Sequence, residues 1–212
     1  MRIQILTSKN SWLYKNKHYI KNDKNIWKKS KIITSYKKIS KNYEVTAILS
    51  YYRIIPEKYL HISKHNIVVH ESNLPFGRGF SPLFRQIAKG KKKIIFTLFK
   101  CSTKMDEGYY YLKKSFYFDN NLLYDEIKIK QIGYAKILIE KFISNLKKKK
   151  LTLKRQKGKP TYFRKLDKND SKIDINKSIN SQFNKMRTKD NNNFPNFFYF
   201  RKRKYILKLS RF

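Results

Sequence analysis

The sequence has 212 residues, of which 51 are Lys or Arg and 14 are Asp or Glu, so its formal net charge is +37. The length suits one substantial core with a small addition to it. The single cysteine, Cys101, excludes an intramolecular disulfide and a cysteine-rich metal site. No run approaches the roughly 20 apolar residues that cross a bilayer, so we expect a cytoplasmic protein without a membrane span.

The positive charge favours an anionic partner, and composition alone points first to RNA. The lysines are spread along the whole chain, however, together with many Asn, Ile, Tyr and Phe residues, whose codons are AT-rich. Genome composition is therefore an alternative source for much of the charge, without any functional demand. A phosphate-bearing substrate of any kind would benefit from it, so the charge does not decide between tRNA, folate and a sugar nucleotide.

Continuous apolar runs predict buried strands in the first half of the chain. They are Ile3–Leu6, Lys31–Ser35, Val45–Ser50, Asn66–His70 and Ile94–Phe99. Runs without polar alternation fit strands that are covered on both faces, as in a parallel sheet flanked by helices. The sequence thus predicts an α/β fold with three layers around a mainly parallel, Rossmann-like sheet.

Two stretches predict helices around that sheet. Ser81 precedes Pro82 and a run that ends at Gly90, which is the pattern of an N-cap, a first-turn proline and a C-terminal glycine. The segment from Asp119 to Leu146 has apolar residues at the three-or-four spacing of an amphipathic helix.

The composition changes after the basic run Lys147–Lys150, where the chain continues as LTLKRQKGKP. We place a boundary there, with a main domain over 1–150 and a small α+β appendage over 151–212 that completes it. The appendage is predicted to hold a polar helix near 176–187, an Asn-rich turn at 190–193 and a hairpin formed by FFYF and KYILKL.

The segment VVHESNLPFGRGFSPLFRQI contains the ordered pattern HxSxLPxxRGxxP. Its members are His70, Ser72, Leu74, Pro75, Arg78, Gly79 and Pro82. About thirty residues later, MDEG supplies Asp106 and Gly108. Together these motifs resemble the folate-dependent formyltransferase family, which includes methionyl-tRNA, glycinamide ribonucleotide and sugar N-formyltransferases.

The resemblance implies that residues 1–150 form a formyltransferase catalytic domain. It would transfer a formyl group from 10-formyltetrahydrofolate to a primary amine, without a metal. A neutral amine attacks the formyl carbon, an oxyanion develops and the nitrogen loses a proton. By resemblance, His70 would accept that proton or stabilise the oxyanion, and Asp106 would orient the imidazole and help to relay the proton.

One position departs from the family pattern. The family usually has Asn two residues before the catalytic His, and this sequence has Val68 there. Asn66 lies on the same strand face as His70, but about 13 Å away, which is too far to share one reacting carbon. Asn73 or Ser72, in the loop after His70, are the candidate replacements, and an inactive enzyme is an open alternative.

The residues around the two motifs and after the third strand are expected to contact the folate, because ligands of open parallel sheets bind beyond the carboxyl ends of the strands. For the aromatic residues after the third strand, packing in the core is the alternative role. The expected folate contacts are Tyr52, Ile54, Pro56, Arg78, Gly79, Met105 and Gly108.

Three functions compete. The first is formylation of a nucleotide-linked amino sugar, expected because the sequence is short and its tail looks like that of sugar N-formyltransferases. The second is a methionyl-tRNA formyltransferase-like activity, with tRNA as the partner and salt-sensitive binding. The third is a catalytically inactive, RNA-binding relative, which would fit Val68 and the charge. The acceptor and the oligomeric state stay open.

Overall fold

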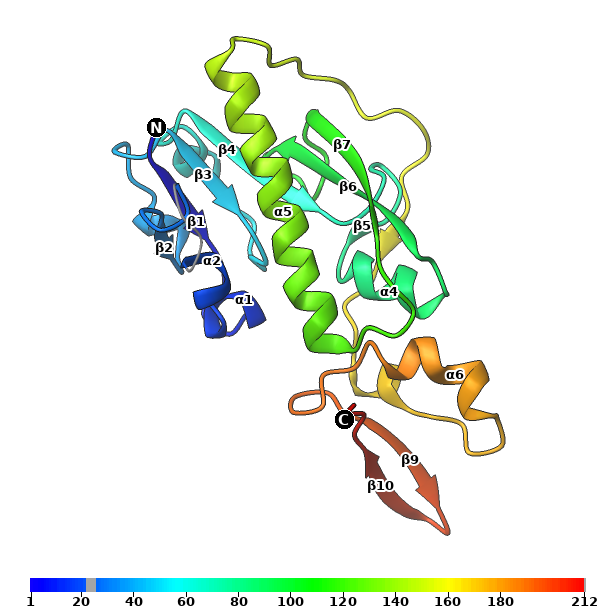
Figure 1. The fold of residues 1–212 in the computed structure, drawn as a ribbon. Helices are drawn as coiled ribbons and strands as arrows, with labels where there is room; N and C mark the ends of the chain where they lie inside the picture. The colour runs from blue at the N-terminus through cyan, green and yellow to red at the C-terminus, as the bar shows by residue number, and fades with distance from the viewer. Residues whose placement is uncertain (22–25, 212) are drawn as a thin grey trace.

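A six-stranded sheet forms the centre of the protein, and Figure 1 shows one long helix crossing its face. The computed structural model describes residues 1–21 and 26–211. In sheet order, the strands are β2 (Lys31–Ile33), β1 (Ile3–Leu6), β3 (Val45–Ile48), β4 (His65–His70), β6 (Lys93–Lys100) and β7 (Tyr110–Tyr117). β2, β1, β3 and β4 run parallel, which confirms the mainly parallel sheet.

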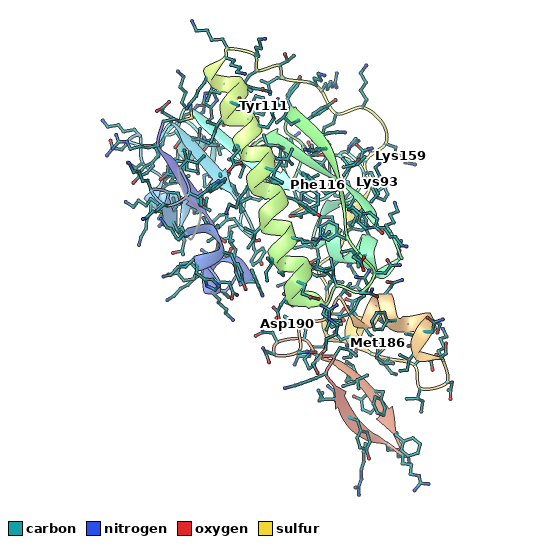
Figure 2. The ribbon with its side chains drawn as sticks, in the orientation of Figure 1. Lys93, Tyr111, Phe116, Lys159, Met186 and Asp190 are labelled. Atoms are coloured by element: carbon teal, nitrogen blue, oxygen red, sulfur yellow. The ribbon has the colours of Figure 1, made fainter. Side chains whose placement is uncertain are left out.

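All five predicted strands are present, but the far edge of the sheet differs from the expectation. β6 pairs antiparallel with β4, and β7 pairs antiparallel with β6. The sequence analysis did not predict β7, because β7 is the edge strand and packs mainly through one face. Its Tyr111 and Phe116 lie against the long helix (Figure 2), with ring centroids 4.9 Å from Phe142 and 4.3 Å from Tyr134. Its solvent-facing residues include lysines, so no continuous apolar run marks it.

The helix α5 (Tyr124–Lys147) covers one face of the sheet and carries Ile127, Leu138 and Phe142 into the core. It begins five residues after the predicted start. The intervening residues form a turn in which Asp119 accepts a hydrogen bond from the Asn121 N–H, 2.7 Å away, and the helix is then capped by Glu126. Side-chain-to-backbone hydrogen bonds of this kind compete with the hydrogen bonds of a helix, and here they delay the start of α5.

Short helices complete the two outer layers. On the face of α5 lie α1 (Trp12–Lys15), α2 (His18–Lys21) and α4 (Pro82–Ala88), and the opposite face is covered by the 3₁₀ turn Tyr36–Lys38 and α3 (Glu57–Leu60). Ser81 precedes α4 as predicted, but its backbone is left-handed, with φ of 52°, and its side chain caps nothing. The predicted N-cap role of Ser81 is therefore wrong.

The strands also bury a polar network near the amino ends of the parallel strands, away from the end at which β4 reaches His70. Gln4 donates to the Thr46 and Ser63 hydroxyls, at 2.9 and 3.0 Å, and Asn66 donates to the Leu60 carbonyl. Because Gln4, Thr46 and Ser63 hydrogen-bond to one another, their side chains can be buried within a layered core. Asn66 is thus occupied in packing this end of the strand.

The residues after 150 return to the main domain. β8 (Tyr162–Phe163) pairs with β5 (Arg78–Gly79). A 3₁₀ turn at Lys168–Ser171 then leads to α6 (Ile179–Met186). A hairpin of β9 (Asn196–Phe200) and β10 (Arg203–Leu207) follows. The predicted helix and hairpin are confirmed. Arg187 is buried and donates to the Asp119 and Leu122 carbonyls, which fastens this segment to the start of α5. The division at residue 150 stays a prediction.

No helix within the described ranges combines the length and the apolar character needed to cross a membrane.

Lys189, in the crevice between α4 and α6, gives a testable pH effect. Burial, opposed in part by Asp170, lowers the pKa of Lys189 from 10.5 to about 8. Between these values the unfolded chain binds more protons, so this group makes stability rise with pH. We expect Lys189→Met to stabilise the fold at about pH 7, with the gain shrinking towards about pH 10. Urea midpoints measured across this range test it. A gain that is constant with pH would contradict it, and Lys177→Met, at an exposed side chain, is the control.

Candidate active site

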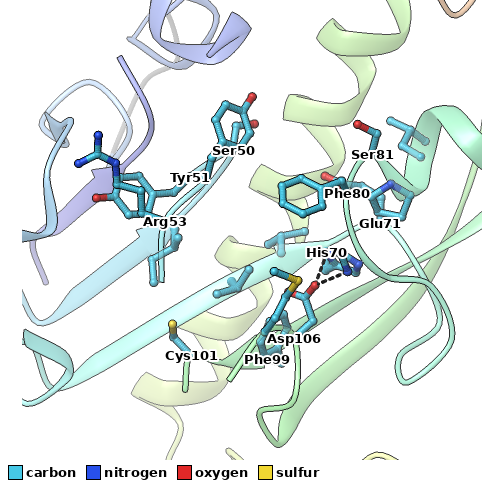
Figure 3. A pocket seen from close by; sticks show the side chains of 18 of the residues that line it. Ser50, Tyr51, Arg53, His70, Glu71, Phe80, Ser81, Phe99, Cys101 and Asp106 are labelled. Carbon is cyan, nitrogen blue, oxygen red and sulfur yellow. Dashed lines mark hydrogen bonds and ion pairs between the residues drawn. The ribbon is translucent and has the colours of Figure 1, made fainter. Parts of the chain in front are cut away.

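A pocket of ≈ 250 Å³ lies at the carboxyl ends of β3 and β4, where open parallel sheets bind their ligands. Figure 3 shows it from close by, with His70 and Asp106 on one side and Ser50, Tyr51 and Arg53 on the other. His70 ends β4, and Asp106 comes from the loop between β6 and β7. The topology therefore brings together two residues that are 36 positions apart in the sequence.

His70 is buried and has a fixed orientation. Its Nε2 lies 2.8 Å from the Gly77 carbonyl oxygen, and its Nδ1 lies 3.7 Å from Oδ2 of Asp106. A carbonyl oxygen can only accept, so this hydrogen bond assigns the proton to Nε2 of the neutral ring. The lone pair of Nδ1 then faces Asp106. The 3.7 Å separation is too long for a direct hydrogen bond, but it places a carboxylate beside any proton that Nδ1 takes up.

The backbone holds Asp106 in an unusual conformation. Its φ is 53°, in the left-handed region that few residues other than glycine adopt, although aspartate tolerates it. Oδ2 accepts the Gly79 N–H at 2.8 Å, and Gln156 donates to the Asp106 and Gly108 carbonyls at 2.9 and 2.8 Å. Gly79 thus fixes the carboxylate directly, and Gln156 fixes the backbone of the loop that carries it.

Arg78, an expected folate contact, lies outside the lining of the pocket and clamps the loop of Asp106 from behind. Its guanidinium donates to Glu107 at 2.8 Å, to Tyr162 at 3.0 Å and to Gln156 at 2.9 Å. Tyr162 and Gln156 belong to the connection after residue 150, so the basic tail holds the motif loops in place. The physical role of Arg78 in this arrangement is positioning.

The other expected folate contacts divide into two groups. Four line the pocket, namely Tyr52, Ile54, Gly79 and Met105. Tyr52, Ile54 and Met105 keep 59%, 50% and 39% of their surface exposed, so apolar surface is available at the rim for a flat ring to cover. Pro56 and Gly108 lie outside the lining, and Gly108 is packed against the end of β6.

The proposed replacements for the family Asn are not brought into the pocket. Asn73 is exposed and accepts a hydrogen bond from Lys113 at 2.7 Å, and it lines a different hollow with Phe76 and Lys91. Ser72 is fully buried, outside the lining, and its hydroxyl has no hydrogen-bond partner among the described residues. Val68 does line the pocket, on the same strand face as His70.

The polar residues that line the pocket and that sequence analysis missed include Glu71, Lys128 and Gln131. Gln131 donates to the Glu71 carboxylate at 2.5 Å, and burial lowers the pKa of Lys128, with Glu71 opposing that shift. Lys128 and Gln131 are three residues apart on α5, which places them on one helix face. The three-residue spacing could have predicted that the two side chains share a helix face. It could not have predicted that this face borders the pocket.

Cys101 also lines the pocket, but its surroundings disfavour the nucleophilic thiolate at neutral pH. Burial, with the nearby Asp106 charge, raises the pKa of the thiol to about 12. The reactive form of a cysteine is the thiolate, which is scarce under these conditions. In the part of the chain that the structure describes, no three His, Cys, Asp or Glu side chains are grouped to hold a metal ion.

Gly108 offers a test of how tightly the Asp106 loop packs. A Cβ at this position would lie 1.8 Å from the Lys100 carbonyl oxygen and 2.9 Å from the Phe99 ring, so β6 and the loop must separate. We expect Gly108→Ala to lower the free energy of unfolding by about 1–3 kcal/mol. In urea unfolding, Gly133→Ala is the matched control, because its Cβ meets nothing within 4 Å and a helix gains about 0.5–1 kcal/mol from this change. Equal midpoints for the two variants would contradict the prediction.

Known proteins that resemble this chain in sequence are formyltransferases. The sequence profile described as "Formyl transferase" matches residues 17–131. The methionyl-tRNA formyltransferase of Thermotoga neapolitana is 29% identical over 153 residues, which make up 71% of this chain and 49% of that protein. The chain therefore spans about half the length of the curated relatives it matches.

Two solved structures extend the likeness to the fold. A methionyl-tRNA formyltransferase from Clostridium thermocellum gives a TM-score of 0.72 at 24% identity and covers 96% of this chain and 90% of its own. The formyltransferase PseJ from Anoxybacillus kamchatkensis, in complex with UDP-4,6-dideoxy-4-formamido-L-AltNAc and tetrahydrofolate, gives 0.54 at 15% identity over 77% of this chain and 85% of its own. These matches confirm the predicted fold class.

Proposed function

The chain belongs to the formyl transferase family, and from this premise we propose that it transfers a formyl group from 10-formyltetrahydrofolate to a primary amine. The observation that carries the proposal is the pairing of His70 with Asp106 inside the pocket at the carboxyl ends of the sheet. Folate supplies the activated formyl group, and the protein supplies orientation and proton transfer.

The proposed step balances as an acyl transfer. The amine nitrogen forms a bond to the formyl carbon, the bond from that carbon to the folate nitrogen breaks, and one proton moves from the amine to the departing nitrogen. Nδ1 of His70 is the proposed proton acceptor, because Nε2 is already bonded to Gly77. Asp106, 3.7 Å away, would stabilise the imidazolium that forms.

The proposed folate position uses the apolar rim. Tyr52, Ile54 and Met105 would cover the flat ring, and Gly79 would let it approach the backbone closely. This placement keeps four of the seven expected contacts. In this placement Arg78, Pro56 and Gly108 do not contact the folate. Arg78 would support the site from behind.

Two acceptors are proposed, and both carry phosphate, as the net charge of +37 favours. The first is a nucleotide-linked amino sugar, which the nucleotide sugar bound by PseJ supports. The second is methionyl-tRNA, which the names of the curated sequence relatives support.

The experiment is release of tetrahydrofolate from 10-formyltetrahydrofolate with each acceptor in turn. The panel contains nucleotide-linked amino sugars with amines at different ring positions, and charged initiator methionyl-tRNA. Turnover with one class identifies the acceptor. Formation of the formamide is confirmed by mass. No release with any acceptor, while a tRNA formyltransferase assayed in parallel is active, would refute the proposed activity for the natural sequence.

A further inference from the structure

The hairpin β9–β10 stands away from the sheet at the far end of the molecule, and nothing in the proposed chemistry uses it (Figure 1). Its base is anchored: Ile173 donates to the Phe197 carbonyl at 2.7 Å, and Asn196 donates to the Met186 carbonyl at 3.0 Å. Phe197 is buried at this base. The outer part of the hairpin is therefore held rigidly while its side chains stay exposed.

One face of the hairpin is an aromatic platform, formed by Phe198, Phe200 and Tyr205. Strand alternation puts Phe198 and Phe200 on the same face, and Tyr205 pairs opposite Phe198. The Phe198 and Tyr205 rings are stacked, with centroids 5.5 Å apart and planes 14° apart. Phe200 and Tyr205 are 48% and 42% exposed, so flat π-faces are open to a ligand.

The hairpin and the residues that follow it are rich in cations. Residues 196–211 contain Arg201, Lys202, Arg203, Lys204, Lys208 and Arg211 and no Asp or Glu. Arg203 pairs opposite Phe200, and the Arg201 guanidinium lies 5.3 Å from the centre of the Phe200 ring. Stacking rings beside backbone-binding cations are the elements by which proteins hold single-stranded nucleic acids.

The turn itself carries a second, independent sign. Arg201 and Lys202 form the two-residue loop, with φ of 47° and 63°. Both positions favour Gly, Asn or Asp, since other side chains are strained there. Arg201 and Lys202 therefore place two positive charges at the tip of the hairpin, and their strained backbone lowers the local stability of the turn.

We propose that the platform Phe198, Phe200 and Tyr205, with the tip cations Arg201, Lys202 and Arg203, binds a single-stranded nucleic acid. Bases stack on the exposed rings and the cations contact the phosphates. A second copy of the chain is a poorer occupant, because two hairpins of like charge repel each other. The inference does not depend on the proposed formyl transfer, since binding is measured without folate or acceptor.

The test is fluorescence anisotropy with a labelled RNA oligonucleotide of about 12 residues and its DNA counterpart, between about 50 and 200 mM salt. Arg201→Asn with Lys202→Gly makes the turn more favourable and removes two charges. It should keep or raise thermal stability, weaken binding, and lower the slope of log affinity against log salt by about 1.4. Phe200→Ala with Tyr205→Ala should weaken binding at least about fivefold and leave that slope unchanged.

The matched control is Lys37→Gln with Lys38→Gln, which removes the same charge from an exposed turn elsewhere. It should change affinity much less than the hairpin variants. Comparing RNA with DNA tells which nucleic acid is preferred. Equal binding by all variants would overturn the proposal. Two other results would overturn it if the hairpin variants leave nucleic acid binding unaffected. One is a dimer, seen by light scattering, that the hairpin variants abolish. The other is binding to anionic lipid vesicles that the hairpin variants abolish.

Discussion

Replacing His70 by alanine is expected to lower the rate of tetrahydrofolate release by about 10²- to 10⁴-fold, the usual contribution of a positioned acid or base. The ring is buried, its Nε2 is held by Gly77, and its Nδ1 faces Asp106 across 3.7 Å. Cys101, which lines the same pocket, is a poor substitute for the imidazole, because burial raises the pKa of its thiol to about 12. The measurement is kcat with the acceptor identified by the panel.

His61→Ala is the matched control, since this side chain is 76% exposed on the surface after α3. It should retain the natural rate. Circular dichroism and a thermal melt of His70→Ala separate lost chemistry from lost folding. A folded His70→Ala protein that turns over at the natural rate would remove His70 from the mechanism.

Replacing Val68 by asparagine is expected to raise the rate by about 10²-fold, which is the cost seen when a single oxyanion donor is removed from an enzyme. Val68 is two residues before His70 on the same strand face and lines the same pocket. An asparagine amide there would donate to the oxygen of the formyl group as charge develops on it. In the family pattern this position usually carries that donor.

Two further substitutions at the same position separate the donor from other effects. Val68→Leu adds apolar volume without a donor, and Val68→Asp has the shape of asparagine with a negative charge that opposes the oxyanion. Neither should raise the rate, and the aspartate should lower it. A rise with all three substitutions would show that pocket shape, and not donation, limits the reaction. An unchanged rate for Val68→Asn would mean that another group already supplies the donor.

This pair of predictions also distinguishes a slow enzyme from an inactive relative. If the natural sequence shows no turnover and Val68→Asn does, the missing donor is the reason for inactivity and the rest of the site is intact. Asn73 cannot be counted as its replacement in the described conformation, because Lys113 holds its side chain in a different hollow.

The local sequence determined the strands of the sheet core, the long helix, the terminal hairpin and the order of the two motifs. These features depend on residues that are near one another in the chain: apolar runs, helical spacing and the linked positions from His70 to Pro82. The exceptions have local causes too. β7 lacks an apolar run because one face of an edge strand meets solvent, and Ser81 adopts a left-handed backbone in place of a capping one.

Only the tertiary structure decided which motif residues meet. It turned Arg78 away from the pocket to clamp Glu107, Gln156 and Tyr162, and it brought Lys128 and Gln131 of α5 beside the pocket of His70. Such contacts join residues more than 25 positions apart, and their partners are chosen by sheet order and by the path of the connection after residue 150. Periodicity and spacing specify which face of an element is buried, but not which distant side chain lies against it.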